Sequence, residues 1–383
     1  MNNEKTVKRV YYVDYLRIFG FLSVIFMHCA YDVLANTSII NTFDWKITAV
    51  VTGLAYTAVP LFFMMSGYFL LTSKKTHDLS VLVKHRLPRL ILPLFFWSLV
   101  AIVWILYNTD ALTFTQFAGQ VVKSFSQPVY VHFWYMYTLI AMYIASPFII
   151  VMLENISRKE HILIFALITL ITVQVMLYKI TPAPLNLFFD MSFLGKFQFF
   201  GGHICAFMLG YYLGKSERHV PNILLIVLAL LCWAGITVGT IHLSVTTNTY
   251  DGTFFSQSEG YEVLFAACLF LLAKQNLNRS NKHLDRLICP LVALSLPIYL
   301  FHNLLLSVLL TYGGKITGFA DIVLYTIIIA FVSYLLNKTL CSVKPLSFVV
   351  TGLTYKKAGK TANWQYTYHW VKNACSRNKT IEN

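Results

Sequence analysis

The sequence predicts an all-α fold, a polytopic membrane helix bundle of about ten transmembrane helices with the N- and C-termini in the cytoplasm. The first observation behind this prediction is composition: 57% of the 383 residues are hydrophobic, 12% are charged, and the mean hydropathy is +0.63. A soluble domain carries about 25% charged residues. The second is that the apolar residues form long runs, near the roughly 20 residues that a helix needs to cross a bilayer. The third is that basic residues gather between alternate runs, as cytoplasmic loops do.

The first run is too long for a cleavable signal peptide and lacks a small-residue cleavage site, so we expect it to be retained as a span. The eighth run is short and begins with Glu259 and Glu262, which makes it the weakest of the set. The predicted spans cover residues 11–34, 47–72, 90–107, 131–153, 161–178, 197–214, 222–243, 259–273, 288–311 and 320–337.

The distribution of Lys and Arg residues predicts which connecting segments lie in the cytoplasm. With the N-terminus in the cytoplasm, 24 of the 30 Lys and Arg residues fall in cytoplasmic segments and only five fall outside. This bias follows the positive-inside rule and favours an even number of spans. The net charge of +14 then reflects basic cytoplasmic segments that contact anionic membrane lipid, and it does not indicate nucleic-acid binding. We expect a multi-pass protein of the cell membrane.

Two domains are predicted. Residues 1–343 form the membrane domain, and residues 344–383 form a basic, aromatic cytoplasmic tail that is interfacial or disordered. Residues 112–127 place apolar side chains on one helical face, which indicates an interfacial helix. The seven cysteines are scattered and no pair has metal-ligand spacing, so we expect no metal.

The segment from Tyr11 to Asp32 contains the first candidate catalytic residues, Arg17 and His28. They are eleven residues apart, about three helical turns, and so return to nearly the same face. Each has a carboxylate on its side of the helix, Asp14 for Arg17 and Asp32 for His28. A neutral imidazole in the outer part of the span accepts a proton from a hydroxyl, with Asp32 fixing its tautomer. The alternative is a packed histidine bonded to a neighbouring backbone.

Arg86 and Arg89 begin the third span from the cytoplasmic side, one turn apart, with Pro88 between them. Two guanidinium groups at a membrane mouth suit phosphate groups, which they bind bidentately. The alternative is ordinary positive-inside flanking.

Aromatic and histidine residues at the outer ends of two further spans are candidate substrate contacts. His132, Trp134 and Tyr135 begin the fourth span, where interfacial aromatics are expected in any membrane protein. His302 lies in the outer half of the ninth span, and its alternative role is packing or a hydrogen bond to a neighbouring helix.

These features together resemble the acyltransferase-3 family of bacterial integral membrane O-acyltransferases. The resemblance runs from about Val10 to Leu340. It rests on VDYLRIFGFLSVIFMH with its Arg-x10-His element, PLFFMMSGYFLL, the Arg-x-x-Arg of Arg86 and Arg89, HFWYMYTLIAMY and SLPIYLFH.

The resemblance implies an enzyme that moves an acyl group, usually acetyl, from cytoplasmic acyl-CoA to a hydroxyl of an extracytoplasmic glycan or lipid-linked sugar. It implies that His28 is the essential residue, that Arg17 is its partner, and that Arg86 and Arg89 bind the acyl-CoA donor. Some relatives carry an added extracytoplasmic hydrolase-like domain, and we expect this chain to consist of the membrane part without it. Whether a separate partner is needed is therefore open.

Two other classes of function remain. One is a transporter or exporter of a glycan or glycolipid without covalent chemistry, which the intramembrane charges also fit. The other is a sensing or scaffolding module that keeps the fold without turnover.

Overall fold

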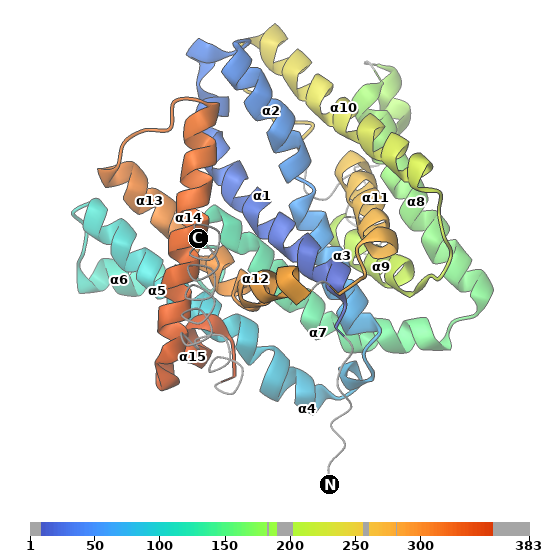
Figure 1. Ribbon diagram of the computed structural model, residues 1–383, viewed down its shortest axis with the longest axis horizontal. Helices are drawn as coiled ribbons and strands as arrows, with labels where there is room; N and C mark the ends of the chain where they lie inside the picture. Colours follow the sequence, from blue (N-terminus) through green and yellow to red (C-terminus); the bar gives the residue numbers. More distant parts are fainter. Residues whose placement is uncertain (1–8, 182–183, 190–201, 256–259, 281, 355–383) are drawn as a thin grey trace, which may run out of the picture.

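The computed structural model describes residues 9–181, 184–189, 202–255, 260–280 and 282–354 (Figure 1). All regular structure within these ranges is helical, as predicted. Eight stretches are long and apolar enough to cross a membrane, which makes this a multi-pass membrane protein. The count of ten spans and the cytoplasmic termini stay predictions. The eight stretches are Tyr11–Ala35, Phe43–Leu71, Leu79–Asn108, Val131–Asn155, Arg158–Tyr178, Asn222–Thr247, Ser295–Tyr312 and Phe319–Ser342.

The α-helices are numbered along the chain, and short 3-10 or π turns separate some of them. Their bounds are α1 Tyr11–Ala35, α2 Phe43–Ala55, α3 Ala58–Leu71, α4 Leu79–Val81, α5 Pro88–Asn108, α6 Phe114–Lys123, α7 Trp134–Asn155, α8 Arg158–Ile180, α9 Gly202–Lys215, α10 Asn222–Thr247, α11 Gly260–Asn276, α12 Lys282–Ala293, α13 Ser295–Tyr312, α14 Phe319–Ser342 and α15 Lys344–Thr351.

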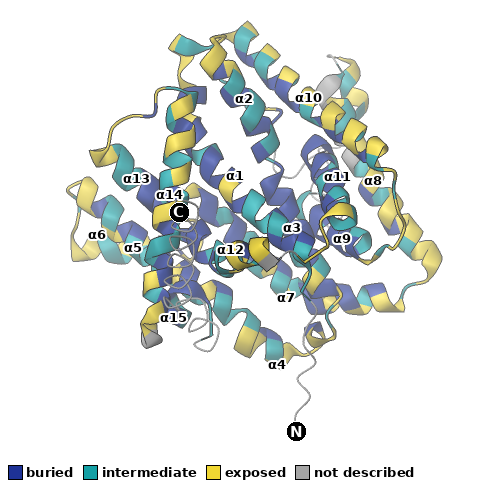
Figure 2. Ribbon diagram, viewed as in Figure 1, coloured by how far each residue is buried: buried dark blue, intermediate teal, exposed yellow. Residues whose placement is uncertain are grey.

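Helix α1 lies in the middle of the bundle (Figure 1). It packs against α2, α3, α11, α12, α13 and α14. Over half of its most apolar 18-residue stretch is buried, whereas a third of the corresponding stretch of α10 and less than a quarter of that of α14 are buried. Figure 2 shows the same contrast, with exposed positions along the outer helices α10 and α14. The helix that carries Arg17 and His28 is therefore the centre of the fold.

The sixth and eighth predicted spans are short helices. Helix α9 has 14 residues and α11 has 17, and the predicted start of the sixth span, residues 197–201, lies outside the described residues. Helix α9 packs closely on α3 because glycines remove side chains from the contact. A Cβ on Gly67 would lie 1.8 Å from the carbonyl oxygen of Phe207, and one on Gly210 would lie 2.0 Å from that of Met64.

The prediction of one continuous ninth helix over 288–311 is wrong. The chain forms α12 and then α13, with a break at Leu294, whose φ of −100° and ψ of 6° interrupt the helix. Pro290 lies within α12, where its ring removes one backbone donor. The predicted second span is also divided, into α2 and α3 at residues 56–57.

The first residues beyond position 343 form α15, which packs against α5 and α14. The indole Nε1 of Trp97 on α5 donates to the carbonyl oxygen of Val350 over 3.1 Å. The division into two domains at 343 stays a prediction, and residues 355–383 of the predicted tail lie outside the described part of the chain. The predicted amphipathic segment contains α6, with Phe114 84% and Val122 71% exposed.

Candidate active site

Three histidines from distant parts of the chain meet beside α1. The ring centroid of His28 lies 5.5 Å from that of His132 and 5.2 Å from that of His302. The rings of His132 and His302 are 4.6 Å apart. His132 and His302 are buried, whereas His28 is half-buried and keeps surface that a water-sized molecule reaches. His28 therefore faces the protein interior.

Backbone and side-chain hydrogen bonds fix the two buried rings. The Nδ1 of His302 lies 2.5 Å from the carbonyl oxygen of Tyr299, one turn earlier on α13. A carbonyl accepts only, so this Nδ1 carries the proton and the Nε2 keeps its lone pair. The Tyr299 hydroxyl donates to the carbonyl oxygen of His132, and the Asn303 amide lies 3.3 Å from the Nδ1 of His132. One face of α13 thus positions two of the three imidazoles.

The other aromatic residues predicted at the start of the fourth span divide between two places. Tyr135 is buried and packs on Tyr299, with ring centroids 5.5 Å apart, beside the histidines. Trp134 stacks instead on His203 of α9, at 4.7 Å and 28°. Tyr130 precedes the span and stacks on His132 at 5.9 Å. Burial raises the pKa of the Tyr130 hydroxyl to about 12, which keeps it neutral at physiological pH.

Arg17 lies nearer than His28 to the N-terminal end of α1. Eleven residues correspond to about 16 Å along the axis. Its guanidinium carbon is 5.4 Å from the centre of the Phe69 ring, a cation–π contact that suits a half-buried arginine. Arg17 also interacts electrostatically with Tyr135, which in turn touches Tyr299. Tyr135 is thus common to the surroundings of Arg17 and of the histidines.

Arg86 and Arg89 lie at the start of α5, where a π turn over Leu82–Arg86 precedes the helix. The Nη1 of Arg86 donates to the Thr76 hydroxyl over 2.7 Å, and its Nη2 donates to the Ser73 hydroxyl over 3.1 Å. Both arginines are half-buried. Arg86 is thus held in a fixed orientation by neutral hydroxyls that leave its charge uncompensated.

The two carboxylates do not take the positions that the spacing predicted. Asp14 lies 2.5 Å from the Nε of Arg9, which also approaches Asp285 at 3.4 Å. Asp14 therefore pairs with Arg9 just before the helix, and no ion pair joins Asp14 to Arg17 among the described residues. Asp32 is exposed and makes no hydrogen bond to His28. Asp14 pairs with Arg9, five residues before it, and Asp32 is exposed, so a shared helix face alone did not determine the partner of either carboxylate.

Tyr143 of α7 was not predicted as a site residue. It is half-buried and lies within electrostatic range of Arg17, Arg86 and Arg89. Tyr143 is one of three tyrosines in HFWYMYTLIAMY, with Tyr135 and Tyr137. That repetition was a usable signal, but interfacial aromatics are so common that it did not distinguish Tyr143.

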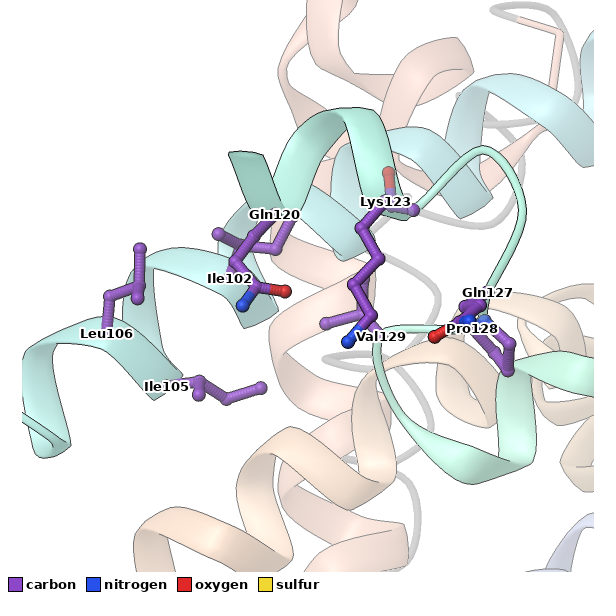
Figure 3. Close-up of a pocket in the computed structure, with 9 residues that line it drawn as sticks. Ile102, Ile105, Leu106, Gln120, Lys123, Gln127, Pro128 and Val129 are labelled. Atoms are coloured by element: carbon purple, nitrogen blue, oxygen red, sulfur yellow. The ribbon is translucent and has the colours of Figure 1, made fainter. Parts of the chain in front are cut away.

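A pocket of about 220 Å³ lies between α5 and α6 at the end of α5 away from Arg86 (Figure 3). Its walls are apolar on the α5 side, and the Lys123 side chain extends through it toward Val129. Val129 directly precedes the segment with Tyr130 and His132. None of the three histidines lines this pocket. It lies beside them, at the same end of the bundle.

Comparison with known proteins identifies the family. A family model described as an acyltransferase domain, acyltransferase-3, matches residues 10–338, nearly the whole chain. No curated protein matches. No solved structure matches. The matched range includes α1, the histidines and the arginines described above. The chain therefore belongs to the acyltransferase-3 family of membrane acyltransferases.

Proposed function

We propose that this protein transfers an acyl group, most simply acetyl, from a cytoplasmic acyl-CoA to a hydroxyl of an extracytoplasmic glycan or lipid-linked sugar. One observation carries the proposal: His28 faces the protein interior against His132 and His302, in a chain of the acyltransferase family. A half-buried imidazole that is not turned to lipid is placed to accept a proton from a reacting group. The enzyme is a protein of the cell membrane in this proposal.

The donor binds at the arginines. Acyl-CoA has a phosphate-rich head, and guanidinium groups bind phosphate with paired, charge-assisted hydrogen bonds. Arg86 is oriented by Thr76 and Ser73 and has no carboxylate among its hydrogen-bond partners. This arrangement leaves its positive charge available to an anion. Arg89 supplies the second group of the pair.

The pantetheine arm then runs from the arginines toward His28. Tyr143 lies within electrostatic range of Arg17, Arg86 and Arg89. Tyr135 lies within range of Arg17 and touches Tyr299 beside the histidines. Tyr143 is thus near the arginines and Tyr135 is near the histidines, and the path of the arm beside these two tyrosines is the one this proposal takes.

Transfer takes place at His28. The acceptor oxygen attacks the thioester carbonyl carbon while the imidazole of His28 takes the hydroxyl proton. The carbon–sulfur bond breaks, the acyl group remains on the acceptor oxygen, and the coenzyme A thiolate receives the proton from the imidazolium. General base catalysis of this kind contributes about 10² to 10⁴ in rate. Buried, oriented rings around His28 reduce the reorganisation needed.

The acceptor approaches the histidines from the opposite end of the bundle to the arginines. His132, His302 and Tyr135 surround that approach, and Trp134 extends it toward His203. Aromatic faces and imidazole nitrogens suit a sugar, which offers apolar ring faces and hydroxyl groups. The pocket with Lys123 beside this region suits the lipid portion or phosphate of a lipid-linked sugar.

The test uses protein in liposomes with radiolabelled acetyl-CoA on the arginine side and a membrane glycolipid extract as acceptor. We expect free thiol to appear together with labelled acceptor, and His28→Ala to lower the rate at least a hundredfold. His219→Ala, at an exposed position, is the matched control. Transfer by His28→Ala at the native rate would show that the base is another group.

The same assay separates the rival functions. An exporter moves the acceptor across the membrane without releasing thiol from acyl-CoA. A scaffold keeps its cellular effect when Arg86 and Arg89 are both replaced by alanine, whereas a transferase loses it. Mass spectrometry of surface glycans from cells with and without the gene identifies the acceptor by a gain of one acyl unit.

A further inference from the structure

The three histidines have the composition of a metal site, which their sequence spacing did not indicate. One ring nitrogen from each of His28, His132 and His302 lies within 4.8 Å of the other two. The residues come from α1, from the 3-10 turn before α7, and from α13. Since three separate elements supply the ligands, no short motif in the sequence reveals the group.

Two of the ring nitrogens are buried and lack partners. The Nε2 atoms of His132 and His302 make no hydrogen bond with any described residue, and these side chains are 3% and 0% exposed. A buried polar atom without a partner costs roughly 1–3 kcal/mol. Such atoms are a sign of an ion, water or catalytic role. Their position in one group with His28 points to a shared ligand.

The hydrogen bonds around the group favour metal binding. The carbonyl oxygen of Tyr299 holds the Nδ1 proton of His302, which leaves the Nε2 lone pair free to bind a metal. Metal-binding histidines use this arrangement, with the second nitrogen donating to a carbonyl or carboxylate. The Asn303 side chain places its amide nitrogen against the Nδ1 of His132; rotation of this amide presents its oxygen instead, which then accepts the Nδ1 proton as the Tyr299 carbonyl does for His302.

The donor set selects the class of ion. Three neutral imidazoles suit Zn²⁺ and neighbouring transition metals, whereas Mg²⁺ and Ca²⁺ prefer oxygen ligands. Tetrahedral Zn–N bonds of about 2.1 Å separate the nitrogens by roughly 3.4 Å. Small side-chain rotations close the present spacing of at most 4.8 Å to that value. Three histidines leave a fourth position for water.

We propose that His28, His132 and His302 bind one Zn²⁺ ion, and that this ion inhibits acyl transfer by occupying the lone pair with which His28 accepts its proton. The second half rests on the proposed function. A neutral imidazole has one nitrogen lone pair, so it either coordinates the metal or takes the proton. Zinc and the acceptor hydroxyl therefore compete for His28.

Metal binding is tested without reference to activity. The purified full chain in detergent is stripped with a chelator, dialysed against Zn²⁺ and analysed by elemental mass spectrometry, and Co²⁺ is bound in parallel for its visible absorption. We expect one ion per chain and a tetrahedral cobalt spectrum. His28→Gln, His132→Gln and His302→Gln each weaken binding by more than a hundredfold, since even loss of a supporting partner costs about 10- to 100-fold.

His203→Gln is the matched control, because His203 is also an interior histidine with an unpartnered ring nitrogen but lies outside the group. It binds the ion as the native chain does. Size-exclusion profiles of all variants check that they are folded. Zinc binding that is absent, or equal in the native chain and the three ligand variants, overturns the proposal.

Activity tests the competition separately. We expect Zn²⁺ to inhibit acyl transfer with a constant equal to its dissociation constant, and a chelator to restore the rate. Stimulation of acyl transfer by Zn²⁺ refutes the proposed competition between zinc and the acceptor hydroxyl, because His28 would then not be the free base. Stoichiometric zinc binding that needs all three histidines in a protein without acyl transfer supports the metal site and refutes the proposed function.

Discussion

The imidazole rings of His28 and His302 lie 5.2 Å apart, although one belongs to α1 and the other to α13. His302 is fully buried and bonded to the carbonyl oxygen of Tyr299, whereas His28 is half-buried. The ring of His302 is therefore held in one position, and the more accessible ring of His28 is oriented against it. This relation makes His302 a positioning residue for His28 in the proposed reaction.

Replacement of His302 by alanine is expected to lower kcat by about 10- to 100-fold, because small misplacements of a reacting group cost about that much. The KM for acyl-CoA stays within about twofold, since the donor is held at the arginines. The measurement is steady-state thiol release over a range of acyl-CoA concentrations. A rise in KM with an unchanged kcat contradicts the positioning role. His161→Ala, which removes a half-buried ring outside the site, serves as the control.

The contact of Arg86 with two hydroxyls predicts that its orientation matters as well as its charge. Arg86→Lys keeps the charge but loses the forked donors to Thr76 and Ser73. We expect the KM for acyl-CoA to rise about tenfold, which corresponds to roughly 1.4 kcal/mol. Arg218→Lys, at an exposed position, leaves it unchanged. Equal KM values for Arg86→Lys and the native chain show that Arg86 does not bind acyl-CoA through the paired N–H groups of its guanidinium.

The close contact of α3 and α9 predicts a stability effect at Gly210. A Cβ there would lie 2.0 Å from the carbonyl oxygen of Met64, so Gly210→Ala must separate the helices. We expect a loss of about 1–3 kcal/mol, as for overpacking in a core, and a lower Tm in a thermal unfolding scan.

Gly119→Ala is the matched control for this prediction. Gly119 lies within α6, and a Cβ there meets no atom within 4 Å. This variant keeps or slightly raises the Tm, because alanine is the better helix former. A Tm for Gly210→Ala equal to that of Gly119→Ala means that the two helices separate without cost.

The sequence allowed the fold class and the helix that carries Arg17 and His28 to be predicted because both depend on local composition. Runs of apolar residues and the Arg17–His28 spacing are properties of one segment. The break at Leu294 was not predicted, since an apolar run reads the same whether it forms one helix or two. The predicted positions of Asp14 and Asp32 used helix geometry alone, which gives a shared face but not a partner: Asp14 pairs with Arg9 just before α1, and Asp32 is exposed.

The grouping of the three histidines was beyond sequence reasoning for the same reason. His28, His132 and His302 were each singled out, but their meeting depends on how α13 and the turn before α7 pack against α1. Tyr143 was not predicted as a site residue for a different reason. Its position within electrostatic range of three arginines is a tertiary property of a residue type that is common in membrane helices.

Lys274 gives a last prediction, on a residue whose charge was counted only as part of the cytoplasmic excess. Its ammonium group lies near the end of α9 and donates to the carbonyl oxygens of Leu213 at 2.8 Å, Gly214 at 2.7 Å and Ser216 at 2.5 Å. The last carbonyls of a helix have no partner within the helix, and a cation there is favourable. Lys274 on α11 therefore holds the end of α9 in place.

Lys274→Met keeps most of the side-chain volume but removes the three donors. We expect a loss of roughly 1.5–3 kcal/mol, the range for hydrogen bonds to a charged group, and a lower Tm. Lys274→Arg keeps only part of the native stability, because a planar guanidinium does not direct three donors to three clustered carbonyls as an ammonium does. Lys75→Met, at an exposed position, leaves the Tm unchanged. If Lys274→Met unfolds at the same temperature as Lys75→Met, the three carbonyls are satisfied by solvent and α9 does not depend on α11 for its termination.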